Sequence, residues 1–232
     1  MALIVDGKLT IPLYHGTSDL FLGSIKEFGL GGRNLIQELC VIELLRQLVA
    51  ICQTSLPNQE EWLVRMDDAE RITRQVVTAG GFNFRHGSAY LTPSLFTAAN
   101  YATSSEYGSE ALGHFIMLWN RLRESHIELP PQISDGALPI IDFADRPKVP
   151  VLVKLVGVPA RILAAENGRS ACDVFRWIEQ FMQDKFFTGY CQQANFEVLD
   201  PIQVRDADVF RIVEPSENSE KEPLLAPYGP NS

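Results

Sequence analysis

Three short segments that stand far apart in this chain carry residues of types that could do chemistry, each among apolar neighbours. His15 and Gly16 follow an apolar run in "LYHGTS", Tyr90 lies in "GSAYLTP", and Glu197 lies in "ANFEVLDP". A glycine after a strand lets a ligand approach the backbone, whose N–H and C=O can pair with a planar amide. A carboxylate among Phe and Val is costly to bury and needs a reason. These residues are therefore candidates for a binding or catalytic site.

Each candidate also has an ordinary structural explanation. His15 could be a hydrogen-bonded structural histidine, and Glu197 could point outward from a strand. Tyr90 and Tyr101 could be core aromatics, the commoner role for such residues. What favours a site is the helix between the two tyrosines, because its small residues would let a flat ring lie close to it; they are Ala98, Ala99 and Ala102.

The first half of the chain is predicted to be mostly helical. A strand is expected over residues 9–15, and then a helix capped by Ser18 or Asp19 and stopped by Gly29. Apolar residues at helical spacing predict a long helix over 34–52. A second helix, from Trp62 to Val76, is expected to end at Gly80-Gly81. Residues 30–80 thus form a largely helical segment.

The second half is richer in strands. A strand over 89–92 carries Tyr90 and runs into Pro93, expected as the first residue of the helix that carries Tyr101. A helix over 109–124 and an irregular, proline-bearing connection through Pro150 follow. Next come a strand over 149–158, a helix over 170–183 and the strands "NFEVL" and "DVFRIV". The class is therefore α+β, with one domain over 1–213 and a disordered tail over 214–232, which is rich in Pro, Ser and Glu.

Composition narrows the function classes. At 232 residues and 46% hydrophobic content, the chain can bury a core as a single domain. We expect neither a secretory signal nor a membrane-spanning stretch, because the first residues and the longest apolar runs fit neither pattern. Its four cysteines form no CxxC pair, so we expect reduced thiols, no metal site and a cytoplasmic location. A net charge of −9 disfavours nonspecific nucleic-acid binding by the whole surface.

Familiar catalytic motifs are missing from the sequence. There is no GxGxxG, Walker loop, HExxH or GxSxG. Four arginines at 65, 71, 74 and 85 could line a nucleic-acid groove. Asp67, Asp68 and Glu70 are interleaved with them, however, so a solvated helix face is the better interpretation.

Taken in chain order, "LYHGTS", the helix "SIKEFGL", "GSAYLTPSLFTAANYA" and a late strand glutamate resemble the ADP-ribosyltransferase superfamily. The resemblance is to its His-Tyr-Glu branch, which includes diphtheria-toxin-like and poly(ADP-ribose)-polymerase-like enzymes. It implies a split β-sheet, here with a helical segment inserted after the first strand. NAD would be a consumed substrate, with no metal required.

The resemblance also implies roles for individual residues. His15 would bond the adenosine-side ribose, and the Gly16 backbone would grip the nicotinamide carboxamide, with Thr17 beside them. Tyr90 and Tyr101 would bracket the nicotinamide ring. Glu197 would be the catalytic glutamate, which stabilises the positive charge that develops on the ribose.

Two departures from the family pattern concern the acceptor. Arginine-modifying relatives carry an acid two residues before the glutamate, where this chain has Asn195, so the sequence does not predict a guanidinium acceptor. The helices at 34–78 match no motif of the family and could shape an acceptor or partner surface. The acceptor is accordingly left as a macromolecule, either nucleic acid or protein.

Two rival functions remain open. The segments "LYHGTS" and "SIKEFGL" also resemble RNA 2'-phosphotransferases, which use NAD and depend on several arginines; here only Arg85 lies near a motif. A non-catalytic binding or interaction module of the same fold is the other alternative. For a transferase without a secretion signal, family habit suggests an intracellular toxin or phage-defence effector of the toxin–antitoxin kind, with a neutralising antitoxin protein as partner.

Overall fold

The computed structural model describes residues 2–56, 60–75, 87–166, 169–214 and 223–229. They form two compact units. The first, which we call the sheet unit, comprises Met1–Arg33, Ser88–Gly108 and Lys148–Ser232; the second, the helical unit, comprises Asn34–Gly87 and Ser109–Pro147. The predicted α+β class is confirmed, and the predicted helical segment falls mainly in the helical unit, which gains two further helices from residues 109–147.

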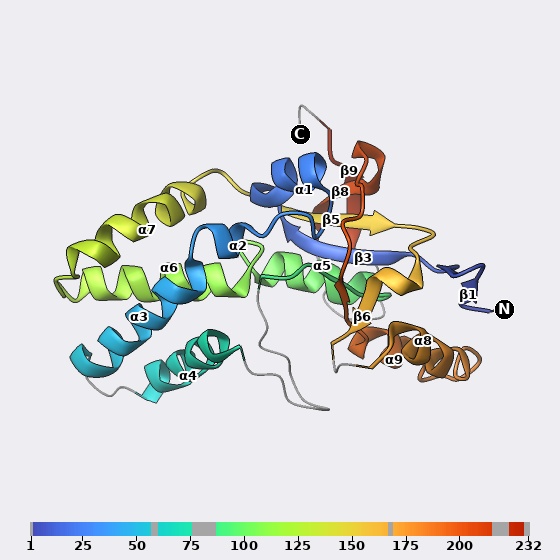
Figure 1. The fold of residues 1–232 in the computed structure, drawn as a ribbon, viewed down its shortest axis with the longest axis horizontal. Coiled ribbons are helices and arrows are strands. Elements are labelled where there is room, and N and C mark those ends of the chain that lie inside the picture. Colours follow the sequence, from blue (N-terminus) through green and yellow to red (C-terminus); the bar gives the residue numbers. More distant parts are fainter. Residues whose placement is uncertain (1, 57–59, 76–86, 167–168, 215–222, 230–232) are drawn as a thin grey trace. The chain divides into compact units, whose positions relative to one another are not determined.

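All strands of the sheet unit pair antiparallel (Figure 1). A four-stranded sheet has the order β3 (Leu13–Ser18), β5 (Pro150–Leu155), β8 (Val209–Glu214) and β9 (Leu224–Pro227). A three-stranded sheet has the order β4 (Tyr90–Leu91), β7 (Phe196–Val198) and β6 (Leu163–Ala165). Two short strands, β1 (Ile4–Val5) and β2 (Lys8–Leu9), form a hairpin. One bridge, Tyr14 to Thr92, links the two larger sheets.

The strand predicted over 9–15 is displaced in the structure. β3 begins at Leu13, directly after Pro12, and all six of its residues have partners on β5. Proline has no N–H to donate, which explains why the ladder starts beyond it. His15 and Gly16 consequently lie in the middle of a strand and not at its end.

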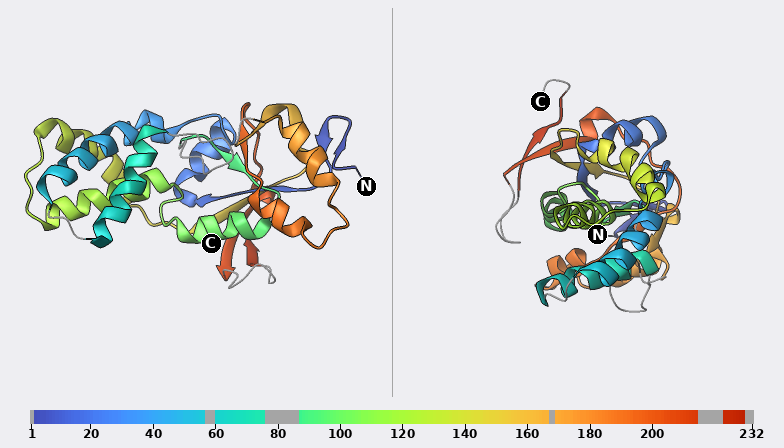
Figure 2. Two further views of the ribbon diagram at one scale, coloured as in Figure 1. Left: turned by 90° about the horizontal axis from the view of Figure 1, so that it is seen from below. Right: turned by 90° about the vertical axis from the view of Figure 1, so that its left-hand side faces the viewer.

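Helices cover the sheets of this unit. Ser18 caps a 3₁₀ turn, Asp19–Phe21, that leads into α1 (Leu22–Phe28), and Gly29 ends α1 at φ 83°, as predicted. α5 (Leu95–Ser104) lies against β3 in the views of Figures 1 and 2. The prediction that Pro93 begins α5 is wrong, because the Ser94 hydroxyl accepts from the Thr97 N–H and is the true N-cap.

The remaining elements of the sheet unit flank its strands. Two helices, α8 (Ala171–Glu179) and α9 (Phe187–Gln193), precede β7, and short 3₁₀ turns occupy Ala160–Ile162 and Asp206–Asp208. β9 corrects the prediction of a disordered tail over 214–232 at residues 224–227, whereas residues 215–222 and 230–232 lie outside the described part of the chain. Residues 224–227 pair with β8, since "PLLAPY" supplies a short apolar strand that the surrounding Pro, Ser and Glu concealed.

The helical unit contains α2 (Leu35–Glu38), α3 (Val41–Ser55), α4 (Glu60–Arg74), α6 (Glu110–Glu124) and α7 (Pro131–Ala144) (Figures 1 and 2). The prediction of one helix over 34–52 is wrong, because Cys40 adopts a left-handed conformation at φ 54° and separates α2 from α3. α4 matches the second predicted helix up to Arg74; the expected end at Val76 and at Gly80-Gly81 lies outside the described residues.

α7 replaces the irregular connection that the prolines suggested. Pro131 occupies the first turn of a helix, where its missing N–H is harmless, and the exposed Pro139 is accommodated inside it. The buried residues still recur at helical spacing; they are Ile133, Ala137, Ile140, Phe143 and Ala144. Core burial at this spacing outweighs the cost of one proline in the helix interior.

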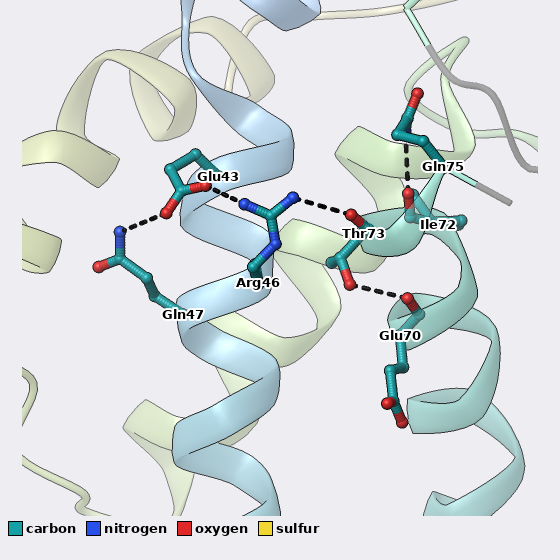
Figure 3. A network of polar contacts seen from close by, with 7 residues as sticks. All are labelled: Glu43, Arg46, Gln47, Glu70, Ile72, Thr73 and Gln75. Atoms are coloured by element: carbon teal, nitrogen blue, oxygen red, sulfur yellow. Dashed lines mark hydrogen bonds and ion pairs between the residues drawn. The ribbon is translucent and has the colours of Figure 1, made fainter.

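A polar network joins α3 to the end of α4 (Figure 3). Arg46 pairs with Glu43 on its own helix and donates from Nη2 to the carbonyl oxygen of Thr73, at 2.9 Å. The last carbonyls of a helix have no partner within it, and cationic side chains stabilise that end. Arg46 therefore holds the carboxyl end of α4 against α3.

Arg71 and Arg74 of α4 lie on a solvated helix face, as predicted, whereas Arg65 contacts Met117 of α6 through Nη1 at 3.6 Å. Arg71 pairs with Asp67 at 2.6 Å and Arg74 pairs with Glu70, both one helical turn away. The fourth arginine of the predicted cluster, Arg85, lies outside the described residues. Among the described residues, no helix is both long enough and apolar enough to cross a membrane.

Candidate functional site

Tyr90 and Glu197 lie directly opposite each other on β4 and β7. The next pair along is hydrogen-bonded, because Val198 donates its N–H to the carbonyl of Ala89 at 2.9 Å. Antiparallel ladders alternate, so Tyr90 and Glu197 form a non-hydrogen-bonded pair, the type in which side chains come closest, with Cα atoms about 4.5 Å apart. Opposite residues share a face, and the structure thus places the predicted tyrosine and glutamate side by side.

The opposite face of this small sheet is core. Leu91 and Phe196 have 0% exposure, and Phe196 stacks on Phe175 of α8 with ring centroids 4.3 Å apart. Because side chains alternate along a strand, this packing fixes the register and turns Tyr90 and Glu197 to the other face, where both are partly buried.

Ser88 orients the carboxylate of Glu197. Its hydroxyl donates to Glu197 Oε1 at 2.7 Å. Ser88 is two residues before Tyr90 and therefore lies on the same side of the chain. Sequence reasoning overlooked this residue, although the quoted motif "GSAYLTP" contains it; the signal available was its even spacing from Tyr90.

His15 is tied to the same strand. Its Nδ1 lies 2.8 Å from the carbonyl oxygen of Tyr90, which can only accept, so Nδ1 carries the proton. Burial lowers the pKa of His15 below the ordinary 6.5, and the hydrogen bond to Tyr90 opposes this only in part. The ring is therefore neutral near pH 7, which leaves Nε2 as an acceptor for a ligand hydroxyl.

This histidine should make stability depend on pH. Because its pKa is lowered in the folded protein, its contribution is fully present above pH 6.5 and is lost as pH falls through the lowered value. We expect His15→Asn, whose amide can still donate to Tyr90, to lose less stability than wild type on acidification. Urea unfolding measured at several pH values checks this, and parallel curves for the two proteins would contradict it.

The backbone of Gly16 faces the side of β3 away from β5. Tyr14 exchanges two hydrogen bonds with Thr92, at 2.8 and 2.9 Å, so its backbone groups point away from β5. Gly16 is two residues further along and points the same way. In the described part of the chain, the pairing between β3 and β4 does not continue past Tyr14–Thr92, so the N–H and C=O of Gly16 lie where the two sheets separate.

Gly16 and the alanine-rich face of α5 pack closely against each other. A Cβ on Gly16 would lie 1.8 Å from the carbonyl oxygen of Ala98. The small residues of α5, expected to admit a flat ring, are instead buried against the four-stranded sheet beside Leu152 and Ile212; they are Ala98, Ala99 and Ala102. That expectation is wrong, because close helix–sheet packing fully accounts for their size.

Fewer contacts tie the other two predicted ligand residues, Thr17 and Tyr101, to the candidate site. Thr17 is 2% exposed, and its hydroxyl donates to the carbonyl of Gly108 at 3.3 Å, an interaction that holds the turn after α5 against β3. Tyr101 is partly buried near the end of α5, one turn after Ala98. Their roles toward a nucleotide stay predictions, whereas His15, Tyr90 and Glu197 are brought together.

Comparisons of the chain with protein-family models, curated proteins and solved structures give no match. The function is therefore inferred from the chemistry of the residues near the site. Among the described residues, no group of three or more His, Cys, Asp or Glu side chains is arranged to hold a metal ion. The RNA 2'-phosphotransferase alternative needs arginines near the motifs, and Arg85 lies outside the described residues.

Proposed function

We propose that the protein is an NAD-dependent mono-ADP-ribosyltransferase that cleaves the bond between nicotinamide and ribose and transfers ADP-ribose to a macromolecular acceptor. The observation that carries the proposal is the pairing of Tyr90 with Glu197, together with the bond from His15 to the Tyr90 carbonyl. The three residues are far apart in sequence, yet adjacent strands bring them together at the point where two sheets separate. Packing alone does not require this combination of residue types.

Binding of NAD would use the groups that the site presents. His15 Nε2 would accept from a ribose hydroxyl, since Nδ1 is already committed to Tyr90. The N–H and C=O of Gly16 would pair with the carboxamide of nicotinamide, which offers one acceptor and one donor in a plane. The rings of Tyr90 and Tyr101 would hold the nicotinamide between them and exclude water.

Glu197 would supply the catalytic charge. When the bond between nicotinamide and C1' of the ribose breaks, its electron pair moves to the pyridine nitrogen and positive charge develops on the sugar. A carboxylate already fixed by Ser88 stabilises that charge without needing to reorganise. The acceptor then bonds to C1' and loses a proton.

The test is the release of nicotinamide from NAD by purified protein, measured alone and with total RNA, DNA or cell lysate. We expect release that depends on Glu197 and rises with one additive, which would also name the acceptor class. A phosphate-bearing spliced RNA added in parallel separates the phosphotransferase alternative. No release under any of these conditions, with NAD binding retained, would support the non-catalytic binding module.

The proposed activity suits a toxin or phage-defence effector. A transferase of this kind would act in the cytoplasm as a toxin or phage-defence effector and would need a neutralising protein partner. Copurification of the untagged product of the neighbouring gene tests this. Failure of the pair to copurify would remove the antitoxin from the proposal and leave the transferase activity unaffected.

A further inference from the structure

A second carboxylate lies next to the candidate site. Glu166 follows β6, and its N–H donates to the carbonyl of Asn195 at 3.1 Å, which continues the ladder between β6 and β7 by one pair. Asn195 Nδ2 also donates to Glu166 Oε2 at 3.2 Å, so their side chains lie on the same side of the ladder. Asn195 is two residues before Glu197 and shares its face.

The spacing between the two carboxylates suits a reacting group. Glu166 is diagonal to Glu197 across the ladder. Diagonal neighbours lie about 7–8 Å apart, with their Cβ atoms somewhat closer, which is within reach of long side chains. The residue directly opposite Glu197 on β6 is Ala164, whose methyl group does not fill the space between them. An acceptor group could therefore contact both carboxylates at once.

The surroundings of Glu166 suit proton transfer. Burial raises the pKa of its carboxyl group, and the hydrogen bond from Asn195 only partly offsets this. A general base works best when its pKa is near the working pH, and a raised pKa moves a glutamate toward that range. One oxygen is occupied by Asn195 and the other can take a proton.

We propose that Glu166, positioned by Asn195, is the acceptor-side general base of the transfer reaction, and that the acceptor is a neutral O–H or N–H group. This rests on the proposed function. As the nicotinamide leaves with the electron pair of its bond to C1', the acceptor oxygen or nitrogen bonds to C1' and its proton passes to the carboxylate of Glu166. No oxidant, reductant or metal is needed for that balance.

Small nucleophiles test the base directly. Methanol must lose a proton as it attacks C1', whereas azide has none to lose. We expect Glu166→Gln to lower the ratio of methyl ADP-riboside to ADP-ribosyl azide by about 10²-fold. Nicotinamide release in the presence of azide should stay within about threefold of wild type, because cleavage depends on Glu197. Glu27→Gln, the same change at an exposed position of α1, is the matched control.

The outcomes separate the two proposals. No nicotinamide release by wild type overturns the proposed function and this inference with it. Release with an unchanged product ratio in Glu166→Gln overturns the inference alone. If thermal melting shows that Glu166→Gln does not fold, Asn195→Ala takes its place; we expect a lower methanol-to-azide ratio from a misplaced Glu166, and an unchanged ratio overturns the inference.

Discussion

Replacement of Glu197 by glutamine is expected to lower nicotinamide release from NAD by about 10³-fold while leaving the affinity for NAD nearly unchanged. Glutamine has the same shape and can still accept from Ser88, so the change removes only the negative charge. The charge of Glu197 stabilises the positive charge that develops on the ribose in the transition state. The ribose of bound NAD does not yet carry that charge, so binding should change little. Steady-state release and NAD titration by calorimetry measure the two quantities separately.

Two further variants define the limits of this result. Glu197→Ala removes the charge and the contact to Ser88, and we expect it to be inactive but folded. Glu27→Gln should retain wild-type release, because the same loss of charge occurs on an exposed face of α1. Full activity in Glu197→Gln would contradict the catalytic role of Glu197. Equal losses of nicotinamide release in Glu197→Gln and Glu27→Gln would instead indicate a general effect of the protein's charge.

Replacement of Gly16 by alanine is expected to destabilise the sheet unit by about 3 kcal/mol or more. The added methyl would lie 1.8 Å from the carbonyl oxygen of Ala98 and 3.2 Å from the Cβ of Ala102. Backbone atoms of α5 cannot yield without moving the helix, so overpacking should cost more than for a flexible neighbour. For a chain of this size the melting temperature should fall by about 6–12 °C.

The matched control is Gly23→Ala on α1. A Cβ there meets nothing within 4 Å, and alanine is the better helix former, so we expect no loss of stability. Urea unfolding of both variants measures the difference. A Gly16→Ala protein as stable as wild type would show that α5 can shift away from β3, which would contradict the packing described for this helix.

Local sequence signals determined much of the secondary structure. Ser18 and Gly29 bound the first helical segment because a hydroxyl satisfies free N–H groups and glycine accepts positive φ. Apolar spacing located α4, α6 and α8 because a helix must bury one face. The same reasoning failed at two places. In α7, burial of neighbouring residues outweighed the local preference of the prolines, and at Cys40 a left-handed conformation interrupts the helical spacing.

Only some residues of the candidate site could be predicted from the sequence. Residue types marked His15, Tyr90 and Glu197, because a polar group among apolar neighbours stands out in any chain. Strand pairing decided the rest: the register of β4, β7 and β6 sets two further residues beside the tyrosine and glutamate. They are Ser88, which the motif "GSAYLTP" contains, and Glu166, which lies in no motif. Contacts between distant segments follow from which faces can be buried together, and only the tertiary structure specifies that choice.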